Sequence, residues 1–139
     1  MKELEEAFDF CKKYLREAVK CLEEGDIVQA CEKLYKVAEE TVKALAKSHE
    51  LDEHKVASER GRWVVSLLEG AVRSLSRIYG YEVEEAWSVA YNRLHIDCFH
   101  EGKLRSDDVK DCIPRVEYLV SVLGERLKEV SSERLSISN

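Results

Sequence analysis

Apolar residues recur at helical spacing along almost the whole chain, and this periodicity limits the fold more than any other feature of the sequence. An α-helix repeats every 3.6 residues, so apolar residues three and four positions apart lie on one face. The first such stripe consists of Leu4, Phe8, Cys11, Leu15, Ala18 and Leu22. No segment of useful length alternates with period two, as an amphipathic strand would. The sequence therefore predicts an all-α fold.

Four further apolar stripes follow the first, and residues typical of helix ends separate them. The stripes cover residues 27–45, 64–78, 83–98 and 109–130. Gly25 can end the first helix and Asp26 can cap the second. Gly80 and Gly102 can close the third and fourth helices in the same way. Short connections between consecutive helices favour an antiparallel bundle of about five helices.

The chain length of 139 residues fits one domain with a single core. We expect the helical-bundle domain to cover residues 1–130 and the polar tail, residues 131–139, to fray. The longest expected connection is residues 48–56. Pro114 is expected either to start the main part of the last helix or to kink that helix.

Charge and hydropathy exclude several classes of protein. The formal net charge of −6 argues against broad, unspecific binding to nucleic acid, which requires a basic surface. No apolar run approaches the roughly 18 residues of a spanning helix, so no membrane association is expected. The N-terminus carries charges from its first turn, unlike a signal peptide, which predicts a cytoplasmic protein. Abundant Lys, Glu and Arg with only three amide side chains resemble a thermophile's composition.

The five cysteines form no CxxC pair, and the strong zinc patterns are absent. Cys11, Cys21 and Cys31 recur every ten residues, but ten helical steps turn successive side chains in different directions. We therefore interpret them as small buried apolar residues and predict no metal and no cofactor. A tight turn at residues 25–26 would still bring Cys21 and Cys31 close enough for a disulfide across the hairpin, which is conceivable in a hyperthermophile.

His49 and His54 lie in the connection at residues 48–56, separated by four residues that include three acids. On a helix the two histidines would share a face and could bind a metal. Histidines near acids in loops are far commoner than metal ligands, so the simpler interpretation is favoured.

The stretch NRLHIDCFHEG, residues 92–102, carries the residues best suited to catalysis. At 100° per residue, Arg93, Asp97 and His100 fall in one column, whereas His95 lies on the other flank and cannot join them without a second chain or helix. Histidine transfers protons near neutral pH and arginine stabilises charge on phosphate, so Arg93 and His100 suit phosphodiester cleavage without a metal. The simpler interpretation pairs Arg93 with Asp97 and places His100 favourably at the helix C-terminus.

The same helix has two apolar faces. The core face is expected to consist of Val83, Trp87, Ala90, Tyr91, Leu94 and Cys98. Val89, Ile96 and Phe99 lie roughly opposite, where a helix at the edge of a monomeric bundle would be polar. A fifth helix or a second subunit could cover this second face, and we predict that it forms the interface of a homodimer.

Two segments carry a family resemblance. The segment EEGDIVQACEKLYKVAEETVKALA, residues 23–46, resembles the second helix of the archaeal PaREP family of small helical proteins. The segment LHIDCFHEG, residues 94–102, is similar to that family's Leu-His-x-x-Phe-Tyr-Glu segment, with one extra residue before Phe99. The family is in turn similar to the HEPN group of helical bundles. That similarity implies a HEPN-like fold and dimerisation, and an RNase that uses an arginine and a histidine four to six residues apart.

Two functions follow as hypotheses. The first is a non-catalytic helical bundle of the PaREP and HEPN type that self-associates and binds a partner protein or a nucleotide. The alternative is a metal-independent endoribonuclease of HEPN type, related to toxin–antitoxin or defence systems. In this alternative Arg93 and His100 are catalytic and Asn92 and Asp97 assist. Arg93 and His100 have six residues between them, and Leu94 stands where the group usually has a polar residue.

Overall fold

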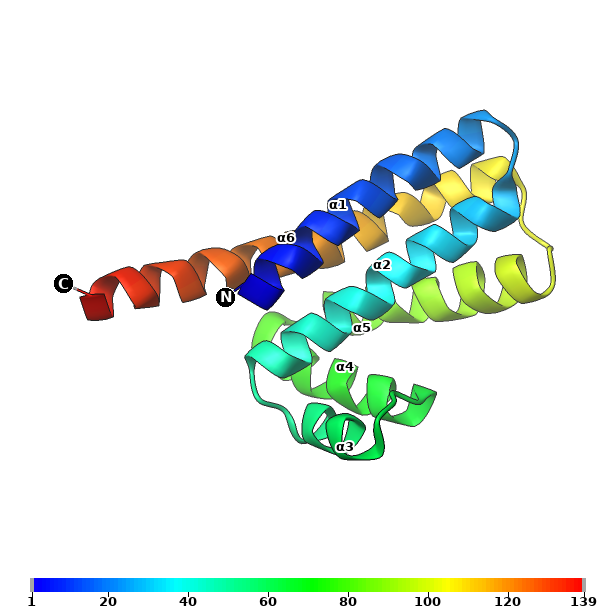
Figure 1. Cartoon of the computed structure of the whole chain (residues 1–139). Coiled ribbons are helices and arrows are strands. Elements are labelled where there is room, and N and C mark those ends of the chain that lie inside the picture. The colour runs from blue at the N-terminus through cyan, green and yellow to red at the C-terminus, as the bar shows by residue number, and fades with distance from the viewer. Residues whose placement is uncertain (1, 139) are drawn as a thin grey trace.

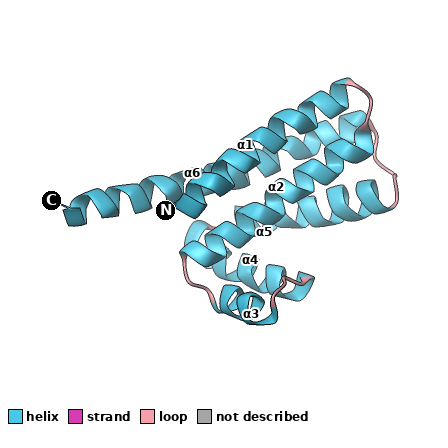
Figure 2. Ribbon diagram, viewed as in Figure 1, coloured by secondary structure: helices cyan, strands magenta, loops and turns pink. Residues whose placement is uncertain are grey.

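The computed structural model describes residues 2–138, and the side chains of residues 2–135. Every regular element in that part of the chain is helical, which confirms the all-α prediction (Figure 2). The elements are α1 (Lys2–Glu23), α2 (Ile27–Ser48), α3 (Asp52–Arg60), α4 (Val65–Tyr79), α5 (Glu82–Val89), η1 (Ala90–His100) and α6 (Ser106–Ser138). Short loops join them, as the sequence predicts for an antiparallel bundle.

Helix α2 is the centre of the bundle. It packs against α1, and it also contacts α6, η1 and α4 (Figure 1). Ten of its residues are buried, among them Leu34, Val37 and Leu45, which are fully covered. A helix enclosed on most sides needs a wide apolar surface, and the small residues Ala30, Ala38 and Ala46 let neighbouring helices approach closely. α5 and η1 form one continuous rod on the side of α2 away from α1.

The predicted helix ends at the first hairpin are confirmed. Gly25 ends α1 with a φ of +81°, a left-handed conformation that glycine adopts without steric cost. The Asp26 carboxylate accepts a hydrogen bond from the backbone N–H of Gln29 at 3.2 Å and so caps α2. Local residue chemistry is therefore sufficient to place this turn.

The expected connection at residues 48–56 is partly wrong, because α3 begins within it at Asp52. Asp52 and Glu53 stand in the first turn of α3, where negative charge interacts favourably with the helix dipole. Gly61 closes the helix in the left-handed region with a φ of +76°. The apolar pattern could not reveal α3, because Ala57 is its single buried residue.

The tail at residues 131–139, which we expect to fray, is helical as far as Ser138, where α6 ends; Asn139 lies outside the described residues. A helix that is already nucleated and packed extends at little cost, and neither glycine nor proline follows Gly124 to stop it. The last turns of α6 project beyond the N-terminus of α1 (Figure 1). Pro114 lies inside α6 rather than at its start.

A disulfide joins Cys31 of α2 to Cys98 of η1, with the two Cα atoms 6.2 Å apart. Pairing of Cys21 with Cys31, which the first hairpin left open, does not occur, and Cys31 is not merely a small buried apolar residue. Cys21 is a half-buried free thiol, because Cys31 lies on the face of α2 that packs against η1. Cys11 is fully buried, as expected for a small apolar residue, with its sulfur 3.5 Å from the Thr41 hydroxyl.

Within residues 2–138, no helix combines the length and the apolar character that crossing a bilayer requires.

Candidate functional site

The segment η1 continues α5 but winds as a π-helix over 11 residues. A π-helix bonds each residue to the fifth one along and has about 4.4 residues per turn, so each residue advances by about 80° instead of 100°. Leu94 and Cys98, four residues apart, are both fully buried on the core side. Both residues stay on that side under this wider winding, since four π-helical steps turn by about 330°. Such segments often occur at functional sites.

The π-winding rearranges the residues predicted to be catalytic. Arg93 Nη1 lies 3.8 Å from Asp97 Oδ2, which confirms the simpler interpretation of that pair. The ring of His100 instead meets His95, with 3.2 Å between the two Nε2 atoms. The expectation that His95 cannot reach the other site residues is therefore wrong. In a π-helix, residues five apart become neighbours. The prediction used the α-helical angle of 100° per residue, which places such residues on different flanks.

Arg93 and His100 point to different sides of η1. Seven steps of π-winding amount to about 210° around the axis, so the expected common column does not form. Arg93 faces α6, where its guanidinium opposes the rise in the pKa of the Cys112 thiol that burial causes. A site that uses both Arg93 and His100 would need the two residues from different copies of the chain.

Aromatic rings with a spacing of four residues line η1 and the end of α5. We call Trp87, Tyr91, His95, Phe99 and the α2 residue Tyr35 the aromatic ladder. Successive ring centroids along the rod are 6.1, 5.5 and 6.1 Å apart. Tyr35 stacks on His95 at 4.1 Å with an interplanar angle of 18°. Burial and the neighbouring His100 lower the pKa of His95. The ladder fixes the orientation of these rings.

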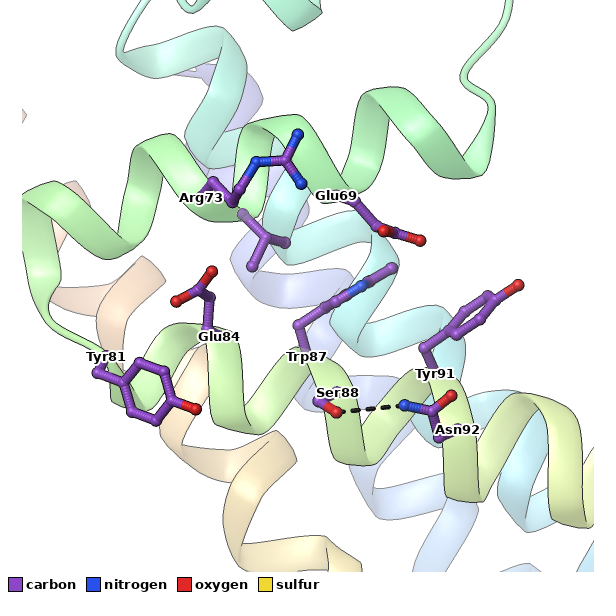
Figure 3. A pocket seen from close by; sticks show the side chains of 9 residues that line it. Glu69, Arg73, Tyr81, Glu84, Trp87, Ser88, Tyr91 and Asn92 are labelled. Carbon is purple, nitrogen blue, oxygen red and sulfur yellow. Dashed lines mark hydrogen bonds between the residues drawn. The ribbon is translucent and has the colours of Figure 1, made fainter.

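A pocket of about 440 Å³ lies at the Trp87 end of the aromatic ladder, between α4 and the rod of α5 and η1 (Figure 3). Its walls are formed by Glu69, Val72 and Arg73 of α4 and by Tyr81, Glu84, Trp87, Ser88, Tyr91 and Asn92. In Figure 3, Glu69 extends from α4 on the side of Trp87 and Tyr91, whereas the Arg73 guanidinium lies across the ribbon of α4 and points away from Glu84. The pocket thus combines aromatic rings, two carboxylates and one guanidinium.

The polar side chains of the pocket are positioned to different degrees. Asn92 donates a hydrogen bond from its amide to the Ser88 hydroxyl at 3.2 Å. The Glu84 carboxylate accepts one from the Ser76 hydroxyl at 3.4 Å and is half-buried. Arg73 is exposed, so its guanidinium is accessible to a solute. Asn92, predicted as an assisting residue, therefore lies at this pocket.

The three residues predicted as an interface are partly covered within the chain itself. Val89, Ile96 and Phe99 are all half-buried. Val89 packs against the core, and the Phe99 ring stacks on His95. Val89 and Ile96 are seven residues apart, and nearly all of that stretch is π-wound, so, contrary to expectation, the two side chains do not share one outer face.

His49 and His54 do not share a helical face, so that premise for a metal site is wrong. His49 follows the end of α2, and its Nε2 lies 2.6 Å from the Tyr79 hydroxyl. Burial, together with the charge of Arg126, lowers the pKa of His49. His54 lies in α3, with its Nε2 3.4 Å from the Ser58 hydroxyl. Among the described residues, no group of three or more His, Cys, Asp or Glu side chains is placed to hold a metal.

Sequence reasoning missed the pocket residues Glu69, Arg73, Tyr81 and Glu84. Their convergence depends on how α4 packs against α5, which no local pattern reports. One signal was present: aromatic or imidazole rings stand at every fourth position from 87 to 99. Such spacing in a helix brings successive rings together.

The fold and the site define a class: a small all-helical bundle with an aromatic-lined pocket beside a π-helical segment. The family model of the archaeal PaREP1/PaREP8 family matches residues 6–120, and the chain belongs to this family. None of the curated proteins compared with this chain matches it.

Two solved structures are similar to this chain. A crystal structure of a protein from Sulfolobus solfataricus has 34% sequence identity and a TM-score of 0.77. The match covers 85% of this chain and 96% of that one. The solution structure of the Orf c02003 protein has 35% identity and a TM-score of 0.74, covering 86% and 92%. Both carry the same structural-genomics target designation, so they count as one relative.

Proposed function

We propose that this protein is a non-catalytic binding module that holds a nucleoside monophosphate in the pocket between α4 and the rod of α5 and η1. The observation that supports this proposal most directly is the composition of the pocket. Aromatic rings, carboxylates and an exposed arginine line a cavity of about 440 Å³. Small-ligand sites typically combine apolar and aromatic walls with a few polar groups that fix orientation.

Each part of the nucleotide has a counterpart in the pocket. Tyr81 and Tyr91 offer aromatic surface for a base, since stacking on such rings contributes about 1–3 kcal/mol per base. The Glu69 and Glu84 carboxylates can accept hydrogen bonds from the N–H groups of the base. Arg73 can bind the phosphate through its planar set of donors.

The charge of the pocket favours one phosphate over three. Glu69, Glu84 and Arg73 together carry one net negative charge, which repels a polyphosphate. A monophosphate places a single anionic group beside Arg73. We therefore expect nucleoside monophosphates to bind more tightly than the corresponding triphosphates.

The binding test uses the fluorescence of Trp87, made the single tryptophan by Trp63→Phe, with AMP and GMP as probes and ATP and GTP for comparison. The Arg73→Gln substitution is expected to weaken monophosphate binding about tenfold or more, because a charge-assisted hydrogen bond contributes roughly 1.5–3 kcal/mol. The matched control is Arg77→Gln, one turn along α4 and also exposed. Absence of any nucleotide response, or equal weakening by both substitutions, would refute the proposal.

We further propose that two copies associate through Val89, Ile96 and Phe99. All three are half-buried, and Ile96, which lies two residues from both Leu94 and Cys98 and therefore faces away from the core, leaves apolar surface that a second copy would cover. Ile96→Glu is expected to shift the dimer to monomer, since a buried unpaired carboxylate is strongly unfavourable. Ile78→Glu, at an exposed isoleucine of α4, is the matched control and should stay dimeric. A monomeric wild type in light scattering would contradict self-association.

A metal-independent endoribonuclease is the second candidate function. The observation in its favour is that Arg93 and His100 are both exposed on the π-helical segment, where a second copy could bring an arginine and a histidine together. Incubation of the protein with RNA in chelator tests it. Cleavage that Arg93→Ala and His100→Ala abolish, and His54→Ala leaves intact, would support the enzyme. RNA that stays intact would eliminate it.

A further inference from the structure

We propose that His95 and His100 form a two-histidine site for a borderline divalent cation of the zinc class. The π-winding of η1 is what brings them together, since residues five apart become neighbours only there. Their Nε2 atoms are 3.2 Å apart. This site is separate from the nucleotide pocket, which neither histidine lines.

The distance between the two nitrogens fits metal ligation. Zinc binds imidazole nitrogen at about 2.0–2.1 Å in tetrahedral geometry, which places two ligand nitrogens about 3.3 Å apart. Two nitrogen donors suit zinc, copper and nickel, whereas magnesium and calcium take oxygen ligands. Without the cation, two neutral imidazoles at this distance share an N–H···N hydrogen bond. Uptake of the ion replaces this hydrogen bond: the proton of the donating ring moves from Nε2 to Nδ1 by exchange with solvent, and both rings turn their Nε2 lone pairs toward the ion.

Aromatic neighbours hold the His95 ring in place, whereas the His100 ring is accessible to solvent. The ring of His95 is stacked between Tyr35 at 4.1 Å and Phe99 at 6.1 Å, which fixes its plane. The ring of His100 meets that of His95 edge-on, with an interplanar angle of 80°, and is exposed. An ion can thus enter from solvent and meet one preoriented ligand.

Water completes the coordination in the isolated chain. Among the described residues, no third His, Cys, Asp or Glu joins the two histidines in a metal-binding group. A site with two protein ligands and water is weaker than a closed structural zinc site, which has four protein ligands. We therefore expect reversible binding that a chelator removes while the fold remains intact.

The experiment is a titration of the full-length protein with ZnCl₂, followed by ¹⁵N NMR of the histidine ring nitrogens. The Nε2 resonances of His95 and His100 should shift together, while those of His54 should stay unchanged. His100→Gln is the principal variant because His100 is exposed and its loss spares the core. It should weaken binding about tenfold or more, and the control His54→Gln should not.

A cobalt titration separates the histidine pair from the three free thiols, Cys11, Cys21 and Cys112. Cobalt bound by imidazole and water lacks the near-ultraviolet charge-transfer band that a thiolate ligand produces. Cobalt binding without that band, lost in His100→Gln, supports the site. Unshifted ring nitrogens, a thiolate band, or equal affinity in His100→Gln would each overturn it.

Discussion

Helix α5 and segment η1 form one continuous rod with one face in the core, yet they keep that face buried in different ways. In α5, Val83, Ala86 and Trp87 are buried at the three- and four-residue spacing of an α-helix. In η1, the fully buried residues Leu94 and Cys98 are four apart and the winding is π-helical. Both an α-helical and a π-helical winding can therefore keep one face of the rod in the core.

What differs between the two parts of the rod is the outer surface. An α-helix makes neighbours of residues three and four apart, whereas η1 also makes neighbours of residues five apart. The contact between His95 and His100 exists for this reason, and the separation of Arg93 from His100 has the same cause. An apolar stripe therefore reports which residues are buried but not which surface residues meet.

The largest expected effect comes from deleting one residue in each part. Deletion of Glu85 in α5 rotates Val83 by about 100° relative to Trp87, so one of the two leaves the core. We expect a loss of about 5 kcal/mol or more in the free energy of unfolding. Deletion of Asp97 in η1 lets the segment wind as an α-helix, and the loss should be about 1 kcal/mol.

The small cost of deleting Asp97 follows from the geometry. Four π-helical steps from Leu94 to Cys98 turn by about 330°, and three α-helical steps turn by about 300°. Cys98 therefore still faces Cys31 after the deletion. Guanidinium unfolding without reductant measures both variants. Equal destabilisation by the two deletions would contradict this difference between α5 and η1.

The next effect concerns the disulfide that fixes η1 to α2. The paired substitution Cys31→Ala with Cys98→Ala should lower the free energy of unfolding by about 4 kcal/mol, because the bridge closes a loop of 67 residues. Cys21→Ala, which removes a free half-buried thiol, is the control and should cost far less. Titration of the denatured wild type should find three thiols without reductant and five with it. Five thiols without reductant would exclude the bridge.

The sequence predicts what depends on local chemistry. The apolar stripes locate most helices and the core, and Gly25 and Asp26 locate a turn, because each signal acts within a few residues. The partner of Cys31 could not be predicted, since it lies 67 residues away. The π-helical winding of η1 could not be predicted either, because it also depends on tertiary packing. Burial of Leu94 and Cys98 permits either winding, and packing of the whole bundle selects one.

The candidate sites likewise divide into those set by local spacing, which were predictable, and those set by tertiary packing, which were not. The pairing of Arg93 with Asp97 was predictable, because residues four apart remain neighbours in both windings. The pocket was not, because Arg73 belongs to a helix whose position relative to Trp87 is set by tertiary packing.

The smallest expected effect compares two arginines that form ion pairs, one with each part of the rod. Arg115 of α6 pairs with Glu85 of α5, and Arg93 pairs with Asp97 within η1. These side chains are 34–46% exposed, so Arg93→Gln and Arg115→Gln should each cost about 0.5 kcal/mol or less. Stability alone therefore does not distinguish them.

The thiol of Cys112 does distinguish the two arginines. Burial raises its pKa and the Arg93 guanidinium counteracts part of that rise, so Arg93→Gln should raise the pKa further. Arg115→Gln should leave it unchanged. ¹³Cβ NMR of Cys112 across a pH titration follows the thiol directly. A titration curve that Arg93→Gln does not move would mean that Arg93 does not face α6, and the separation of Arg93 from His100 around η1 would then have to be abandoned.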